Sequence, residues 1–526
     1  MCSFCTKTGV SRIQKGGGLL KTVRWKKWVP AAAAAACLAL SGCGAGTGQN
    51  AGDRLNAIVW GVPMLFLMAA VGGCLTIRTG GIQFRRFGHI MRMTVGRLFN
   101  GTTAGSGEIT PFQALSTAMA GTIGTGSIAG VVSAITMGGP GALFWLWVMA
   151  FLGMGTKYAE VVLSIRYRQR GAGGEWAGGP MYYIQNGMGR RWKWMAMLFC
   201  VFGMLASFGI GNAVQVSCIA EAVAHLLRPA QTGTGRAASA SDWIVGITAA
   251  AVTGFTLIGG IKRLGSVTAR LVPLMSLVYV VSCLAVILSN AAQIGPAFAV
   301  IVRSAFSPPA VIGGTAGYAL KTCVTWGVRR GIFTNEAGLG SAPMAHAASS
   351  ETNAVRQGFY GVFEVFADSM ILCTLTGLTV LCCDLGSVSY TLNYGVQGSS
   401  ADVSRAFATV LGERASGWII AVCMVLFALS TILGWALYGS RCCEYLFGAG
   451  SVRPFQILFS GFCIVGAAAR AESVWNMADA CNGLMALPNL IAVLALSGTV
   501  AEATRAYFAR LDAGLRRVNG RSACKK

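Results

Sequence analysis

Two glycine-interrupted segments carry the residues best suited to ligand binding. The first, GTIGTGSIAG, spans 121–130 and interleaves glycines with the hydroxyl residues Thr122, Thr125 and Ser127. Glycine weakens a helix, and a break there would free backbone carbonyls, which together with hydroxyls suit a small hard cation. The half-helix expected from Ser127 to about Thr136 would point N–H groups and its positive dipole end at a carboxylate. The alternative is that the glycines only allow close helix packing.

The second segment, GVRRGIFTNEAGLGSAP, spans 327–343 and also alternates glycine with polar residues. Its glycines bracket Thr334 and Asn335, residue types that commonly cap the start of a helix. Phe333 precedes them and is suited to form one wall of a small pocket. We therefore expect a second broken helix, with Phe333 and Asn335 at its break.

Three acidic residues lie in segments that are otherwise poor in charge. Glu336 belongs to the second glycine-rich segment, Asp368 to a later apolar segment, and Glu160 to the end of another. An ionisable residue at membrane depth is functional by default, for example as a gate or a cation ligand. The alternative for Glu336 is that it pairs with Arg329 or Arg330 and only fixes the break, and structural pairing stays open for the other two acids as well.

Polar residues in two further apolar segments are placed to complete a binding site. Asn212 and Gln215 are one helical turn apart in FGIGNAVQ. Thr431 and Trp435 are spaced i,i+4 in FALSTILGW and therefore share a face, with Ser430 beside them as a second hydroxyl. Each residue alone is equally suited to hydrogen bonding between helices.

The amino-acid composition indicates what class of protein carries these residues. Of the 526 residues, 54% are hydrophobic and only 11% are charged, whereas soluble domains carry about 25% charged residues. Although the formal charge is +24, the basic residues form short clusters between apolar segments, without the aromatic interleaving of a nucleic-acid surface. We therefore expect a polytopic helical protein of the lipid bilayer, with no nucleic-acid partner, no structural metal site and no organic cofactor.

Apolar segments of membrane length predict about eleven transmembrane helices. They lie near 56–77, 110–137, 141–165, 194–227, 243–261, 267–290, 311–347, 355–383, 415–440, 454–470 and 474–499. Loops after the first, third and fifth spans and the C-terminal tail are rich in Lys and Arg, and the alternate loops are poor in them. By the positive-inside rule the first span begins outside a bacterial cytoplasmic (inner) membrane and the C-terminus is cytoplasmic.

Three regions are predicted along the chain. Residues 1–43 resemble a signal segment that ends in a lipoprotein-type box at Cys43, although an uncleaved or accidental signal remains an alternative. A transmembrane domain follows at 56–500, and a basic cytoplasmic tail at 501–526. Without its first span the domain divides into two halves of opposite topology, each opened by a glycine-interrupted helix, which is the pattern of an inverted-repeat transporter.

Several motifs together resemble one family, the alanine/glycine:cation symporters, also called sodium:alanine symporters. GGPGALFWLWVMAFLG at 138–153 is similar to the family signature almost throughout, and GTGSIAG, the second glycine-rich segment, STILGW and WNMADACNGLMALPNLIA are similar to other family segments. The resemblance covers about residues 56–500. It implies a leucine-transporter-like five-plus-five inverted repeat with one extra leading helix, and uptake of alanine or glycine coupled to Na⁺ or, in some members, H⁺.

The resemblance also implies roles for individual residues. The amino-acid carboxylate would meet the backbone at Thr125 and Gly126, and the substrate would be framed by Gln215, Phe333, Thr431 and Trp435. The coupling cation would lie between the first broken helix and the ninth span, with candidate ligands Thr122, Ser127, Ser430 and Thr431. Ser127 departs from the family, because the corresponding position is expected to hold Asn.

Two other functions remain as alternatives to symport. A membrane-embedded sensor would bind an amino acid without moving it, but it should carry an output module, and only a short basic tail follows residue 500. A passive channel would conduct without accumulation. An enzyme is not expected, because the sequence has no metal motif and no nucleophile elbow.

Overall fold

The structure is a computed structural model that describes residues 59–97, 109–171, 174–227, 239–307, 316–387, 389–468 and 471–523. The described residues are mostly helical, with one short antiparallel pair of strands, β1 (Gln169–Arg170) and β2 (Trp176–Ala177). The predicted signal segment at 1–43 lies outside the described residues. The fold is therefore all-helical, as the sequence predicts.

The membrane helices follow one another in the predicted order. The leading helix is α3 (Val62–Arg78), and the first half then contains α6 (Pro111–Thr122), η3 (Thr125–Ser127), α7 (Ala129–Gly138), α8 (Ala142–Tyr167), α10 (Lys193–Phe208), η6 (Gly209–Ala213), α11 (Val214–Leu227), α12 (Ala240–Ile258) and α13 (Gly260–Ser289). The second half contains α15 (Ala316–Asn335), α16 (Ala342–His346), α17 (Ala354–Val365), η10 (Phe366–Leu372), α18 (Cys373–Gly386), α20 (Glu413–Phe447), α21 (Val452–Ala468) and α22 (Ala471–Ala495), and α23 (Ser497–Ala523) follows it.

Short helices connect these spans. They are α4 (Ile82–Arg85), α5 (Phe87–Thr94), α9 (Pro180–Tyr183), α14 (Ile294–Phe306) and α19 (Ser400–Leu411). None of the five was predicted. All lie in connections between apolar spans, where hydropathy gives no signal for a helix that does not cross the bilayer.

Among the described residues, seven helices are long and apolar enough to cross a membrane, or eight if the bent pair formed by α22 and α23 counts as one span. The other predicted spans fall short for physical reasons. The helix α3 has 17 residues, and the spans that open each half are interrupted. The bend between α22 and α23 measures 54°, and the predicted start of the tail at 501 falls inside α23.

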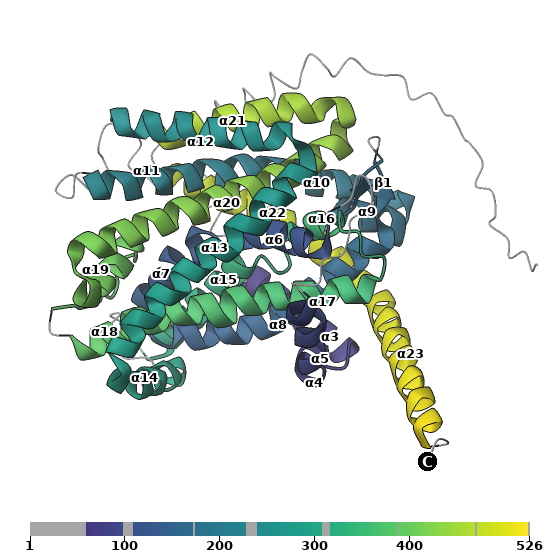
Figure 1. The fold of residues 1–526 in the computed structure, drawn as a ribbon, viewed down its shortest axis with the longest axis horizontal. Helices are drawn as coiled ribbons and strands as arrows, with labels where there is room; N and C mark the ends of the chain where they lie inside the picture. The colour runs from purple at the N-terminus through teal and green to yellow at the C-terminus, as the bar shows by residue number, and fades with distance from the viewer. Residues whose placement is uncertain are drawn as a thin grey trace, which may run out of the picture. The chain divides into compact units, whose positions relative to one another are not determined.

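Helices of the first half pack against their counterparts in the second half. The straight span α8 lies against α17, and α12 lies against α21 (Figure 1). The two interrupted spans also cross, since α6 contacts α16 and α7 contacts α15. This pairing is the arrangement expected of two related repeats, and it brings the two breaks into one region.

The first break follows a well-defined helix start. Thr110 and Gln113 form a capping box at the beginning of α6, with Pro111 in the first turn. The helix then ends at Thr122, and the backbone is extended at Gly124 before a single 3-10 turn leads into α7. A Cβ atom at Gly124 would lie 2.6 Å from Thr431 Oγ1. Glycine therefore both permits the break and allows α20 to approach closely.

The second break differs from its prediction in one respect. The sequence predicted a helix start at Thr334 and Asn335, but Asn335 is the last residue of α15, and the next helix begins at Ala342. The side chain of Asn335 accepts a hydrogen bond from the backbone N–H of Ala337 at 3.0 Å, and this bond stabilises a turn that leaves the helix. Asn and Thr favour turns after a helix as well as caps before one, and the sequence alone did not separate the two.

Candidate functional site

The first break and α11 meet through a side-chain hydrogen bond. Thr125 Oγ1 donates to Gln215 Oε1 at 3.2 Å, and Gln215 Nε2 donates to the carbonyl of Ile210 at 3.1 Å. Gly126 faces α15, since an added Cβ would lie 3.6 Å from Thr334 and 4.0 Å from Phe333. The structure thus brings Thr125, Gly126, Gln215 and Phe333 to one place.

The second break is centred on Glu336. This buried residue has a φ of 52°, in the left-handed region that L side chains rarely adopt, and among the described residues it is the only non-glycine residue with a positive φ. Its carboxylate accepts from Trp435 Nε1 at 3.0 Å and from Ser341 Oγ at 2.5 Å. The alternative pairing of Glu336 with Arg329 or Arg330 is not formed in the structure, where Arg329 instead pairs with Asp479 at 3.3 Å. Strain of this kind persists where surrounding contacts hold it and is common at ligand sites.

The hydroxyls of α20 lie beside the first break. Thr431 Oγ1 donates to the Phe427 carbonyl at 3.0 Å and faces Gly124. Ser430 Oγ donates to the Phe427 carbonyl at 2.8 Å, and it also lies 3.4 Å from the carbonyl of Ala120. Both hydroxyl oxygens keep free lone pairs at these distances, because a hydroxyl that donates its proton still accepts or coordinates.

Asp368 is fully buried in the π-helical turn η10 and contacts the first break. Ser127 Oγ donates to its Oδ1 at 2.6 Å, and Ser369 Oγ donates to its Oδ2 at 3.0 Å. Thr376 Oγ1 donates to the carbonyl of Ser127 at 2.9 Å. The helix that carries Asp368 is therefore joined to the break by a side-chain bond and a backbone bond.

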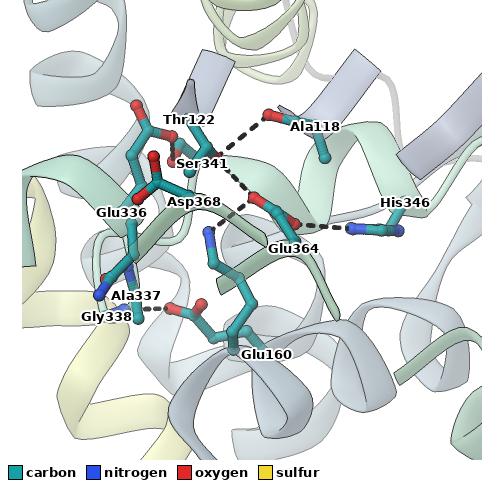
Figure 2. Close-up of polar contacts among 12 residues, drawn as sticks. Ala118, Thr122, Glu160, Glu336, Ala337, Gly338, Ser341, His346, Glu364 and Asp368 are labelled. Carbon is teal, nitrogen blue, oxygen red and sulfur yellow. Dashed lines mark hydrogen bonds and ion pairs between the residues drawn. The ribbon is translucent and has the colours of Figure 1, made fainter. Parts of the chain in front are cut away.

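Three residues that the sequence did not single out, Lys157, His346 and Glu364, form a buried cluster with Thr122. Glu364 accepts from Thr122 Oγ1 at 2.5 Å and from Lys157 Nζ at 3.1 Å, both on Oε1, while His346 Nε2 lies 3.1 Å from its Oε2 (Figure 2). All four residues are at most 4% exposed. Glu364 is therefore a fourth buried acid, in addition to Glu336, Asp368 and Glu160, which the sequence analysis named.

The signal for this cluster was present in the sequence. Lys157 is a basic residue within an apolar span, and Glu364 precedes Asp368 by four residues, which places the two acids on a similar helix face. Each charge looked isolated because its partner lies on another helix, and in this cluster Lys157 and Glu364 are 207 positions apart.

Glu160 connects α8 to the second break. Its Oε1 accepts from the backbone N–H of Gly338 at 3.1 Å and from Asn489 Nδ2 at 2.5 Å. Asn489 also donates to the Gly338 carbonyl at 2.9 Å. Figure 2 shows Glu160, Glu336, Glu364 and Asp368 gathered in one region. Asn212, by contrast, does not join this region, since its Nδ2 donates to the carbonyl of Phe459 on α21.

Comparisons with known proteins show which family and which relatives this chain is similar to. The sequence profile of the sodium:alanine symporter family matches residues 46–520. The sodium/alanine symporter AgcS of Methanococcus maripaludis is 40% identical over 457 residues, which cover 86% of this chain and 96% of that protein. The probable sodium/glutamine symporter GlnT of Bacillus subtilis is 33% identical over 464 residues, which cover 87% and 90%.

A solved structure supports the fold. The crystal structure of MhsT in complex with L-phenylalanine aligns with a TM-score of 0.52 at 13% sequence identity, covering 77% of this chain and 99% of that one. This likeness confirms the leucine-transporter-like architecture. The chain is thus a multi-span membrane transporter rather than an enzyme, and it belongs to the sodium:alanine symporter family.

Proposed function

We propose that this protein imports a small neutral amino acid, alanine or glycine, by symport with Na⁺, with H⁺ as the alternative coupling ion. The observation that carries the proposal is the meeting of the two broken helices with α11 and α20, through the bonds Thr125–Gln215 and Trp435–Glu336. Breaks at corresponding positions of two repeats are where transporters of this architecture hold their substrates.

The substrate carboxylate binds the backbone at Thr125 and Gly126. The half-helix α7 begins directly after them, at Ala129, so its first N–H groups and its positive dipole end favour an anion there. The other groups that frame the substrate are Gln215, Phe333, Thr431 and Trp435.

The coupling cation binds beside the carboxylate site, and its candidate ligands come from the first break and α20. They are Thr122, Ser127, Ser430 and Thr431. A bound cation orders the unwound backbone between α6 and α7 and so completes the site for the amino acid. The two ligands then favour each other by a coupling free energy of about 1–3 kcal/mol, which acts equally in both directions. Asn335, Glu336 and Asp368 hold the breaks in place or gate access to them.

The aromatic walls favour a small side chain. Trp435 is buried, and its ring lies so close to η6 that a Cβ atom at Gly211 would be 2.3 Å from Trp435 Cβ. The indole N–H is already bound to Glu336. A longer side chain would have to displace the indole, so alanine and glycine are preferred over glutamine, the substrate named for the Bacillus relative.

The proposed orientation follows the distribution of basic loops. The protein spans the bacterial cytoplasmic membrane with the start of the first span outside and the C-terminus inside. Residues 1–43 act as a signal segment, with Cys43 as the candidate for lipidation.

Uptake of labelled alanine into proteoliposomes tests the proposed function. An inward Na⁺ gradient should drive accumulation above equilibrium, and unlabelled glycine should compete better than glutamine. A sensor would show binding without uptake, and a channel would show equilibration without accumulation. Uptake that responds to neither a Na⁺ gradient nor a pH gradient would rule out symport.

A further inference from the structure

Two buried carboxylates lie four residues apart where α17 continues into η10. Glu364 and Asp368 are both 0% exposed and belong to one continuous helical segment. They differ in the charge that faces them. Burying an ionised carboxylate is costly unless a counter-charge or a set of donors compensates it.

Glu364 already has a counter-cation supplied by the protein. The Lys157 ammonium lies 3.1 Å from its Oε1, and the hydroxyl of Thr122 donates to the same oxygen. On the other side, His346 Nδ1 lies 2.8 Å from Gln357 Nε2, an amide nitrogen that donates, so His346 carries its proton on Nε2 and donates it to Glu364. The charge of this carboxylate is therefore balanced by Lys157, and its oxygens accept from Thr122, Lys157 and His346.

Asp368 has no such counter-cation. Within the described ranges no Lys, Arg or His forms an ion pair with it, and its hydrogen-bond donors are the neutral hydroxyls of Ser127 and Ser369. The charged groups that act on it from the surrounding helices are Glu364, of like charge, and Lys157, which is bonded to Glu364. Its negative charge is left for a ligand to balance.

The surroundings of Asp368 are rich in oxygen. The hydroxyl oxygens of Ser127 and Ser369 lie 2.6 and 3.0 Å from the two carboxylate oxygens. Carboxylate and hydroxyl oxygens are preferred by hard cations such as Na⁺, which need neither His nor thiolate ligands.

We infer that Asp368 and Ser127 bind the transported Na⁺, whereas Lys157 is the fixed counter-cation of Glu364. This inference rests on the proposed symport and adds a carboxylate ligand to its cation site. Because Ser127 belongs to the first break, a cation at Asp368 reorients the hydroxyl that now donates to this carboxylate. Binding of the cation therefore affects the backbone of the first break, where the amino acid binds.

The test is Na⁺ binding to the purified protein without amino acid. The thermal midpoint is measured while NaCl replaces choline chloride at constant ionic strength, which gives the half-maximal Na⁺ concentration. Wild type should be stabilised by Na⁺. Asp368→Asn, which keeps the size and one oxygen, should raise the half-maximal concentration by about tenfold or more.

The matched control removes the other carboxylate together with its counter-cation. Glu364→Gln with Lys157→Met leaves no unpaired charge and should keep the half-maximal Na⁺ concentration within about twofold of wild type. If Asp368→Asn does not fold, Ser127→Ala serves instead, since it retains the carboxylate, and a several-fold weaker Na⁺ response is expected.

Each contrary outcome has its own meaning. An unchanged Na⁺ curve in Asp368→Asn, or an equal shift in the Glu364/Lys157 double variant, overturns the assignment while leaving symport intact. A wild type that ignores Na⁺ both here and in uptake overturns the assignment of sodium, and the proposed symport itself falls only if uptake also ignores a pH gradient. A midpoint that responds to pH but not to Na⁺, and loses this response in Asp368→Asn, places a proton at Asp368 and overturns the assignment of sodium.

Discussion

Glu364 and Asp368 show two ways in which one helix holds a negative charge inside the membrane. Glu364 is bonded to Lys157 and to donors on α6 and α16, so it ties together four helices. Asp368 is bonded only to hydroxyls, one of them in the first break. If our inference is right, the protein supplies a counter-cation where helices must stay together and leaves a carboxylate without one where an ion is exchanged.

The largest effect is expected from removing one partner of the buried ion pair between Lys157 and Glu364. Lys157→Met leaves the Glu364 carboxylate buried without its ammonium, and loss of one partner of a buried pair costs about 3–5 kcal/mol. The double variant with Glu364→Gln should recover most of that loss. Thermal unfolding in detergent measures both. A single variant as stable as wild type would contradict the role given to Lys157.

A smaller effect is expected from crowding the first break on the side that faces Thr431 of α20. Gly124→Ala places a Cβ atom 2.6 Å from Thr431 Oγ1, and relieving such an overlap costs about 1–3 kcal/mol. Alanine uptake should fall by about tenfold. Gly130→Ala is the matched control, because its Cβ would lie at an ordinary 3.7 Å from Arg330. Equal losses in the two variants would argue against the close approach of α20.

Trp435→Phe tests whether Glu336, like Asp368, is a carboxylate that takes part in ligand binding. The substitution keeps an aromatic wall but removes the indole N–H that donates to Glu336 at 3.0 Å. Loss of a hydrogen bond to a charged group costs about 1.5–3 kcal/mol. Alanine affinity should weaken about tenfold, as measured by equilibrium binding. The same loss should be absent when Glu336 is already Gln, and additive losses would show that the two side chains act independently.

The smallest effect is expected from Ser127→Asn, which restores the residue expected in the family. An Asn side chain supplies an N–H donor for Asp368 and an oxygen for a cation. Na⁺ should remain the preferred ion, with a change in half-maximal concentration of less than about tenfold. Uptake with Na⁺ replaced by Li⁺, K⁺ or choline measures this preference. A switch of the preferred cation would show that Ser127 sets ion choice.

The sequence predicted the spans well because each depends on local composition. The span expected at 141–165 is Ala142–Tyr167, and the one expected at 355–383 covers Ala354–Gly386. The breaks were also predicted, since glycine at 121–130 and 327–343 is a local property of the backbone.

The partners of the buried charges could not be predicted in the same way. Ser127 and Asp368 are 241 positions apart, and Trp435 and Glu336 are 99 apart. Such contacts depend on how the two halves pack, which hydropathy does not encode. The sequence therefore indicated which polar residues needed partners, and the structure supplied the partners, including Lys157 and Glu364, which had been overlooked.

The most direct test of the account is the affinity for alanine with and without Na⁺, measured by equilibrium binding to the wild type and to Asp368→Asn. If Asp368 binds the coupling ion, Na⁺ should raise the affinity of the wild type by about 5–150-fold and have little effect on Asp368→Asn. A wild type that binds alanine equally well without Na⁺, or an Asp368→Asn variant that keeps the full Na⁺ effect, would contradict this role of Asp368.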